Sequence, residues 1–399
     1  MNKYRTAGLT LIVLALVLLV GINYLNNPKR RIPLVFSPKS LLSALWNSYK
    51  INILEAKTFR TLDKQRNNVT TSEGQSYTML RAVWMDDKQT FDQSWAWTKD
   101  NLQHKSNDQL FSWVFGQLPN GQYGVLTAQG GNNTASDGDT DIALALIFAS
   151  SRWGDQTYMA EAQKILDSVW NNEVVIINNK PYLAADNLEK SGKGDVLVNP
   201  SYLSPASYKI FAKADTKHDW NALADTSYDV IQNSAKANLE KKSSAGLPPD
   251  WIMLDRKTAA IKPAGASGLD SNFSYDALRV PFRLALDWQW FKDPRDQQIL
   301  NSFRFLSTEW TDNKAIYSSY SHDGQTLQNT ENPAMYGGTI GYFMVADPAN
   351  ASTIFDQKLK SLYNTDAYTW KQQPGYYEDN WAWFGIALYY QQLNNLYQQ

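Results

Sequence analysis

Apolar positions recur along this chain at helical spacing, and loops rich in Gly, Asn, Asp and Pro separate the stretches. Residues 139–149 and 381–390 are apolar on nearly every face, which is typical of buried inner helices, whereas 157–171 keeps one polar face, as an outer helix does. Inner and outer helices in these proportions predict an all-α toroid of paired helices. The stretches predicted to be helical are 38–50, 73–85, 91–103, 139–153, 157–171, 204–214, 219–236, 283–292, 295–309, 333–346, 351–362 and 377–394.

Short β segments are expected only at 173–177, 181–183 and 315–317. From Ser37 onward the sequence contains no exact repeat, low-complexity segment or Pro/Ser-rich linker that would divide it. We therefore expect residues 37–399 to form one domain.

The N-terminus has a different pattern. An apolar run covers about 7–24, long enough to span a bilayer as a helix, and no small-x-small cleavage site stands clearly at its end. We expect 1–25 to be an uncleaved signal anchor and 26–36 a basic linker. Basic residues lie on both sides of the run, so the charge count gives little orientation. A cysteine-free, Trp-rich remainder favours an extracytoplasmic catalytic domain at the cell membrane, or a secreted one if the run is cleaved.

Composition narrows the possible chemistry. The 399 residues carry a formal net charge of −1, which gives no polyanion-binding signature, so no nucleic-acid partner is expected. There is no Cys and there are only three His, far apart in sequence, which leaves carboxylates, Tyr, Arg and Lys to do chemistry. The chain has 15 Trp and 22 Tyr. Their flat faces with a polar edge suit sugar rings, although most of the Trp are expected in the core.

Three carboxylates, Asp137, Asp139 and Asp141, crowd the start of the helix predicted at 139–153. One could act with Ser136 as a helix cap, because acids near a helix N-terminus are stabilised by its dipole. Calcium binding is excluded, since an EF-hand loop needs Gly and Glu where this chain has Ile and Phe. A D-x-D motif for a metal and a nucleotide sugar lacks a Gly-rich phosphate loop. Catalytic or sugar-binding carboxylates remain.

Glu73 stands at the start of the helix predicted at 73–85. Ser72 and Gln75 have the spacing of a capping box, which does not require Glu73. A general acid must hold its proton, so burial or a nearby carboxylate would have to oppose the helix dipole. Asp137 and its neighbours could supply this effect if the fold brings them close. The alternative is a first-turn Glu with no further role.

Two more segments carry polar side chains in restrained surroundings. Pro281 places Asp276 at a helix entry, and Arg279 is close enough to pair with it and keep it ionised, as a general base requires. A structural ion pair is the alternative. The segment 199–202, Asn-Pro-Ser-Tyr, is a rigid loop in which Tyr202 could hold a water or a sugar hydroxyl, or it is a generic turn.

Together these segments resemble glycoside hydrolase family 8 in order, spacing and local sequence. The chain has S-E-G-Q-x-Y-x-M-L at 72–80 and A-S-D-G-D-x-D-I-A at 135–143, then N-P-S-Y at 199–202 and Y-D-A-x-R at 275–279. The resemblance extends from about residue 38 to near the C-terminus. It implies an (α/α)6 barrel that hydrolyses β-1,4-linked polysaccharide with inversion.

The resemblance also implies roles for single residues. Glu73 would be the general acid and Asp276 the general base, while Asp137 would contact the sugar at the cleaved linkage and favour its distorted ring. Tyr202 would help to hold the nucleophilic water. No metal or cofactor is implied. Further substrate contacts are expected from Arg279, Asp139, Tyr275, Trp84, Trp113 and Tyr123, with Trp84, Trp113 and Tyr123 as stacking platforms.

The leading hypothesis is a membrane-anchored endo-β-1,4-glucanase that trims or releases a polysaccharide during export, with a polysaccharide synthase complex as a candidate partner. The same fold could instead cleave chitosan, xylan, lichenan or a non-glucose exopolysaccharide. A hypothesis from another class is a non-catalytic, membrane-tethered carbohydrate-binding subunit. All four motifs keep their chemical residues, which argues against it.

Overall fold

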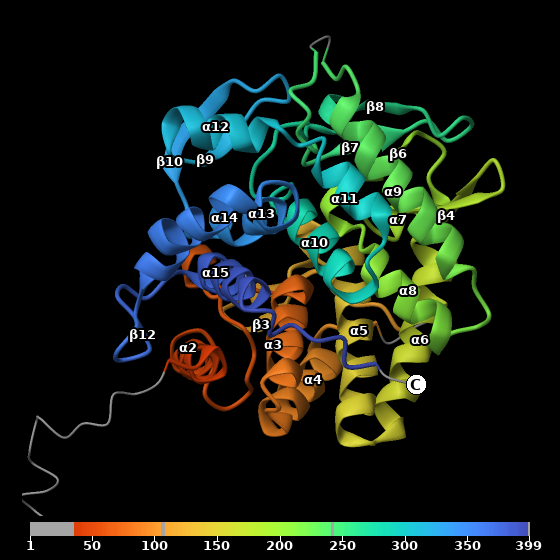
Figure 1. Ribbon diagram of the computed structural model, residues 1–399. Helices are drawn as coiled ribbons and strands as arrows, with labels where there is room; N and C mark the ends of the chain where they lie inside the picture. Colours follow the sequence, from red (N-terminus) through yellow and green to blue (C-terminus); the bar gives the residue numbers. More distant parts are fainter. Residues whose placement is uncertain (1–35, 105–107, 241–242, 398–399) are drawn as a thin grey trace, which may run out of the picture. The chain divides into compact units, whose positions relative to one another are not determined.

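The computed structural model describes residues 36–104, 108–240 and 243–397, and these residues are mainly helical. Figure 1 shows the helices and the short strands between them. The helices are α2 (Pro38–Asn52), α3 (Ser72–Trp84), α4 (Lys88–Asn101), α5 (Ser136–Trp153), α6 (Gln156–Asn172), α7 (Leu188–Ser191), α8 (Pro205–Ala214), α9 (Trp220–Lys236), α10 (Arg279–Phe291), α11 (Pro294–Leu300), α12 (Phe305–Asn313), α13 (Pro333–Ala346), α14 (Pro348–Ile354) and α15 (Tyr376–Tyr389).

The strands form small antiparallel sheets, β1–β2–β3, β4–β5, β6–β7–β8, β9–β10 and β11–β12. Two of the three strands predicted from the sequence are present as β4 and β5, while the third begins later, at Tyr317. The expectation that β segments occur only at these three places was wrong, because the described residues also form short strands in the loops between the helices. The bounds are β1 (Thr70–Thr71), β2 (Val114–Gln117), β3 (Tyr123–Val125), β4 (Val174–Ile177), β5 (Lys180–Leu183), β6 (Val196–Val198), β7 (Ile252–Leu254), β8 (Ile261–Pro263), β9 (Tyr317–Tyr320), β10 (Thr326–Glu331), β11 (Tyr363–Asn364) and β12 (Thr369–Trp370).

The helices pack in an inner and an outer set. Helix α3 contacts α5, α5 contacts α8, α8 contacts α10, α10 contacts α13 and α13 contacts α15, so these helices follow one another around the core. Each also packs against a neighbour outside this series: α4 on α3, α6 on α5, α9 on α8, α11 on α10, α14 on α13 and α2 on α15. This adjacency is consistent with the expected (α/α)6 barrel. Buried apolar side chains fill the interior as one continuous cluster.

Contacts between α3 and α15 close the inner series. The guanidinium of Arg81 donates to Asp379 across 3.0 Å, and both side chains are fully buried. Tyr77 of α3 meets Trp381 of α15 edge to face, with ring centroids 5.7 Å apart. A buried ion pair specifies which helices adjoin, because either partner left alone would be an uncompensated charge.

Three local expectations were wrong. The stretch 295–309 is not one helix but two, α11 and α12, with a turn between them. Thr71 is the N-cap of α3 and accepts from the Gly74 amide, whereas the side chain of Gln75 is buried and accepts from the Thr61 amide. Helix α5 begins without a side-chain cap hydrogen bond. A side chain such as that of Gln75 therefore makes a tertiary hydrogen bond instead of the cap hydrogen bond that its local spacing predicts.

Gly138 allows the N-termini of α3 and α5 to meet. A Cβ at this position would lie 2.5 Å from Oγ of Ser72 and 3.1 Å from the amide nitrogen of Glu73. Any larger residue would force the two helix starts apart. The glycine between Asp137 and Asp139 thus brings the start of α5 against Glu73.

Within the described part of the chain, no helix is both long and apolar enough to cross a membrane. The signal anchor predicted for 1–25 lies outside the described residues, as does nearly all of the linker predicted for 26–36. Both stay predictions.

Candidate active site

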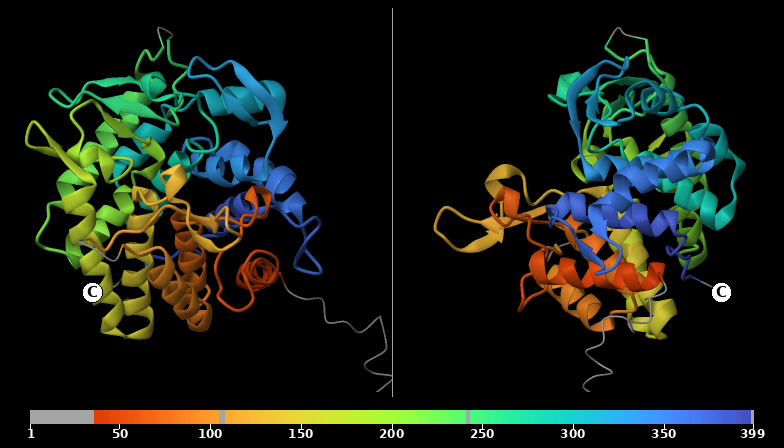
Figure 2. Two further views of the ribbon diagram at one scale, coloured as in Figure 1. Left: turned by 180° about the vertical axis from the view of Figure 1, so that it is seen from behind. Right: turned by 60° about the vertical axis from the view of Figure 1, so that its left-hand side comes forward.

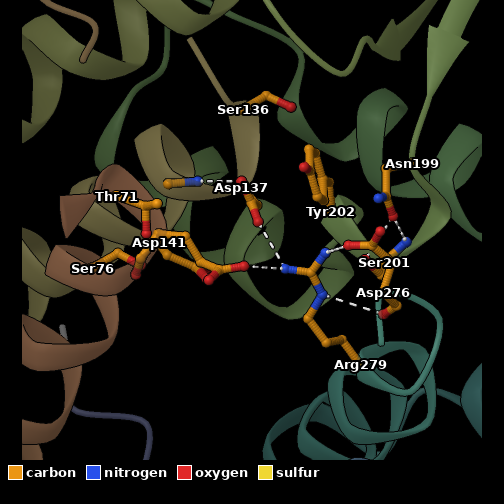
Figure 3. Close-up of polar contacts among 12 residues, drawn as sticks. Thr71, Ser76, Ser136, Asp137, Asp141, Asn199, Ser201, Tyr202, Asp276 and Arg279 are labelled. Atoms are coloured by element: carbon orange, nitrogen blue, oxygen red, sulfur yellow. Dashed lines mark hydrogen bonds and ion pairs between the residues drawn. The ribbon is translucent and has the colours of Figure 1, made fainter. Parts of the chain in front are cut away.

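Arg279 brings three carboxylates together at the N-terminal ends of inner helices. Its Nη1 lies 2.8 Å from Oε2 of Glu73 and 2.9 Å from Oδ2 of Asp137, and its Nη2 contacts Oδ1 of Asp276. Glu73 comes from the first turn of α3, Asp137 from α5, and Asp276 from the turn just before α10. Figure 3 shows the guanidinium pointing between Asp137 and Asp276. The sequence predicted the Arg279–Asp276 pair but not the contacts with Glu73 and Asp137.

The four charged groups differ in exposure. The side chains of Glu73 and Asp276 are 22% and 32% exposed, whereas those of Asp137 and Arg279 are 2% and 1% exposed. Glu73 and Asp276 line a cleft of about 420 Å³ together with Asp63, Gln65, Arg66, Tyr275, Tyr376, Tyr377 and Glu378. Two carboxyls therefore face the cleft, and a buried ion pair supports them from beneath.

Burial dominates the electrostatics of this site. Desolvation raises the pKa of Asp276, and Asp137 raises it further, although Arg279 and Trp251 act in the opposite direction. Arg279 pairs with Asp276 as expected, but the net shift of the Asp276 pKa is upward, so the expectation that this pairing keeps its pKa low was wrong. Burial also raises the pKa of Asp137 to about 6, with Arg279 opposing and Glu73 adding to the shift.

Both cleft carboxyls have neutral hydrogen-bond donors that sequence reasoning missed. The hydroxyl of Tyr376 donates to Oε1 of Glu73 across 2.8 Å, and the indole of Trp251 donates to Oδ2 of Asp276 across 3.1 Å. Tyr376 opens α15, more than 300 positions from Glu73. No local pattern marks it, because the sequence does not show which helix starts share one end of the core.

Asp250 holds the turn that carries Asp276. Its Oδ1 accepts from the amides of Ser274, at 3.1 Å, and of Ala277, at 2.7 Å, and its Oδ2 accepts from the Ser274 hydroxyl. The Asp250 side chain is buried, and desolvation with the nearby charge of Asp276 raises its pKa to about 7. The two prolines just before it, Pro248 and Pro249, indicate a loop but do not mark this role.

Comparison with known proteins shows which family this chain belongs to. The model for glycosyl hydrolases family 8 matches residues 34–370, most of the chain. The chain belongs to this family. The resemblance inferred from the four motifs is thereby confirmed.

Relatives in family 8 have been named for different polymers. The chain is 29% identical over 338 residues to endoglucanase A of Acetivibrio thermocellus, covering 83% of this chain and 64% of that protein. It is 28% identical over 333 residues to the reducing-end xylose-releasing exo-oligoxylanase Rex8A of Paenibacillus barcinonensis, covering 81% of each. The crystal structure of an endo-1,4-D-glucanase from Vibrio fischeri ES114 shares the fold, with a TM-score of 0.72, 22% identity, and coverage of 87% of this chain and 94% of that one.

Tyr202 and Tyr275 lie at the site, as the family motifs predict. The ring of Tyr202 lies over the Arg279 guanidinium, 5.1 Å from its centroid, and packs edge to face on Trp251. Tyr275 is 38% exposed and lines the cleft. Tyr202 is thus beside Arg279 and the cleft carboxyls, and Tyr275 is at the surface that a ligand would touch.

Asp139 and Asp141 do not face the cleft. Asp139 is fully buried and accepts from the Phe111 amide across 2.9 Å, and its carboxyl pairs with that of Glu173. Asp141 forms a two-pronged ion pair with Arg283 at 2.9 and 3.1 Å. The expectation that Asp139 contacts substrate was therefore wrong in this structure, and both residues support the core around the start of α5.

The three expected stacking platforms have different surroundings. Trp84 is buried: its indole donates to the Asn394 carbonyl and packs between Phe148 and Phe384, so it offers no face to a sugar and that expectation was wrong. Trp113 is half-buried and donates to the Gly130 carbonyl. Tyr123 is 48% exposed on the β2–β3 hairpin, which Figure 2 shows standing out from the helices.

Proposed function

We propose that this chain is an inverting, endo-acting glycoside hydrolase that cleaves a β-1,4-linked polysaccharide, with a cellulose-like glucan as first candidate. The observation that carries the proposal is the pair of partly exposed carboxyls, Glu73 and Asp276, in one cleft above the buried Arg279. Family 8 membership and the names of the endoglucanase relatives support the choice of reaction and polymer.

In this mechanism Glu73 protonates the glycosidic oxygen as the bond from that oxygen to the anomeric carbon breaks. Asp276 accepts a proton from a water, whose oxygen bonds to the anomeric carbon from the opposite face. The Tyr376 hydroxyl can accept as well as donate, so it can remain bonded to Glu73 in either protonation state. Arg279 offsets the negative charge that collects on the carboxyls.

Asp276 is positioned to be the base by the groups that hold it. Trp251 and Arg279 each occupy one carboxylate oxygen, which fixes the plane of the group. Tyr202 lies over the same guanidinium, close enough to help orient the water. Preorganised groups of this kind lower the barrier because they need not rearrange during the reaction.

A panel of purified polymers tests the proposal. Reducing-end release is measured for the wild type, Glu73→Gln and Asp276→Asn on cellulose derivatives, lichenan, xylan and chitosan. We expect release from a β-1,4 glucan by the wild type alone, and an inverted anomer in the first product by NMR. A retained anomer, or activity only on an α-linked polymer, would contradict the mechanism. Binding without cleavage of any polymer would favour the non-catalytic alternative.

Xylan is the second candidate substrate, because the similarity to Rex8A covers as much of this chain as of that protein. The same panel separates the two: a ratio of kcat/KM that favours xylan-derived over glucan-derived oligosaccharides would select it.

A membrane setting and a role in export belong to the proposal as well. The apolar run at 7–24 supports an anchor, and the cysteine-free, Trp-rich remainder favours the extracytoplasmic side, where an exported polysaccharide and its synthase complex would be met. Membrane fractionation followed by protease accessibility tests the placement. Recovery of the intact chain in the soluble fraction would contradict it.

A further inference from the structure

A second cavity lies at the other end of the inner helices from the catalytic cleft. It has a volume of about 670 Å³, and we refer to it as the tail cavity. Asp137 and Arg152 stand 15 positions apart on α5, which corresponds to roughly 22 Å along a helix. A sugar bound between Glu73 and Asp276 therefore does not occupy the tail cavity. Its polar lining residues are Arg152, Gln289, Gln391, Asn394 and Asn395, with the indole of Trp290.

The wall of the tail cavity is fixed to the helices. The Leu393 carbonyl accepts from the Gln289 amide at 3.0 Å and from the Trp290 indole at 2.7 Å, and the Asn394 carbonyl accepts from Trp84 at 3.0 Å. Figure 1 shows the segment after α15 crossing toward the end of α5. Because α3 and α10 both anchor this segment, the cavity is preorganised and a ligand would pay little ordering entropy.

The lining chemistry suits a neutral polyhydroxyl ligand. Side-chain amides both donate and accept, as sugar hydroxyls do, and an indole face can cover the apolar face of a sugar ring. The lining contains no carboxylate, and its one cation, Arg152, lies 3.6 Å from Asp86. A cationic ligand would find no counter-charge there, and an anionic one would compete with Asp86.

Two buried atoms beside the tail cavity lack hydrogen-bond partners among the described residues. They are an acceptor, Oε1 of Gln289, and a donor, Nε of Arg152. Buried polar atoms are almost always paired, by protein, water or ligand. Both side chains line the tail cavity, and rotation of either one into it would bring the unpaired atom within reach of a ligand hydroxyl, which donates and accepts at once.

We propose that the tail cavity is a second binding site for a neutral β-linked oligosaccharide stretch, separate from the catalytic cleft. The identity of the sugar rests on the proposed function. A polymer held at both places would be retained near the enzyme between cleavage events, because the second contact becomes intramolecular.

Binding without turnover tests this site. In the Glu73→Gln background, cellohexaose is titrated by calorimetry and by NMR, and we expect two molecules bound per chain. Adding Gln391→Ala and Asn394→Ala should weaken the second event at least tenfold and leave the first unchanged. These two side chains line the cavity, and the anchoring bonds of the segment use backbone carbonyls. Gln392→Ala, next in sequence but outside the lining, is the matched control.

The possible results separate this inference from the proposed function. One bound molecule in the cleft alone, or a second event unaffected by the double variant, overturns the tail site and leaves the glycosidase proposal standing. Two binding events with no cleavage by the wild type overturn the glycosidase proposal alone. No binding at either place overturns both. In the active enzyme, the double variant should keep its kcat on short soluble oligosaccharides and adsorb several-fold less to insoluble polymer.

Discussion

Arg279 and Glu73 contact each other across 2.8 Å, although 206 positions separate them in the sequence. The same guanidinium nitrogen lies 2.9 Å from Asp137, and the second nitrogen contacts Asp276. One buried cation thus fixes the relative positions of the proposed acid, the proposed base and a third carboxylate. The site is a charge network with Arg279 at its centre, and its response to substitution follows from that arrangement.

Replacing Arg279 with Met should cost about 3–5 kcal/mol of the free energy of unfolding, because Asp137 is buried and, among the described residues, neither it nor the two cleft carboxyls has another direct cationic contact. Activity should fall with it. Urea unfolding followed by fluorescence measures the first effect. Arg295→Ala removes a partly exposed arginine that also contacts two aspartates, and it should cost no more than about 1 kcal/mol. Equal midpoints for the two variants would contradict the central role of Arg279.

Asp137→Asn should move the acidic limb of the pH–rate profile to lower pH. The charge of Asp137 raises the pKa of Asp276, so removing it lowers that pKa and keeps the base ionised in more acidic solution. The kcat/KM profile of the variant checks the direction. Asp139→Asn removes a neighbouring carboxylate that pairs with Glu173 instead, and should leave this limb in place. A shift to higher pH in Asp137→Asn would contradict the assignment of Asp276 as base.

The sequence identified the motifs that form the candidate site because each motif is local. Glu73, Asp137 and the Asp276–Arg279 pair stand in short segments whose order and spacing carry the family signature. Their meeting was predictable only through the resemblance. Tyr376 and Trp251 were missed because they complete the site from distant segments, with no local pattern of their own.

Burial accounts for the other errors. The raised pKa of Asp276 arises mainly from desolvation, which depends on the folded core and cannot be inferred from the residues next to Asp276 in the sequence. Trp84 is of a residue type that stacks on sugar rings, but at the end of α3 its ring packs against Phe148 and Phe384. Burial also explains the error at Asp139. This residue lies two positions after Asp137, and helical periodicity therefore places it on another face of α5.

Glu173→Gln should make stability less sensitive to a rise in pH from about 5 to 8. Burial raises the pKa of Glu173 from 4.5 to about 8, so its contribution to stability is fully present below pH 4.5 and is lost as pH rises through 8. The loss can reach about 1.4 kcal/mol per pH unit for one proton. Gln does not ionise and can still accept from Thr134. Tm measured from pH 5 to 9 should therefore decline less in the variant, and parallel curves would refute the buried pair as the cause.

Asp250→Ala should lower kcat about 10- to 100-fold with little change in KM, because the turn carrying Asp276 loses its three hydrogen bonds and small displacements of a catalytic group are costly. Asp250→Asn keeps an acceptor for the backbone amides and should recover part of the activity. Asp215 is another buried aspartate, outside the lining of the cleft, that accepts from the Trp220 indole and the Lys217 amide. Asp215→Ala should lower Tm and leave kcat unchanged. If Asp215→Ala lowered kcat as much as Asp250→Ala does, Asp250 would act only through overall stability.

Gly138→Ala should separate the two helix starts that assemble the site. The new Cβ would lie 2.5 Å from Oγ of Ser72, a distance that real contacts do not adopt, so α3 must shift relative to α5. Because Glu73 follows Ser72 directly, the shift moves the acid away from Arg279, and we expect at least a tenfold loss of kcat together with a lower Tm. Gly194→Ala, where a Cβ meets nothing within 4 Å, is the matched control and should leave both values near wild type. If Gly138→Ala kept full activity, the close approach of α3 and α5 would not be what positions Glu73. The glycine of the D-G-D motif would then be required for some reason other than the geometry of the site.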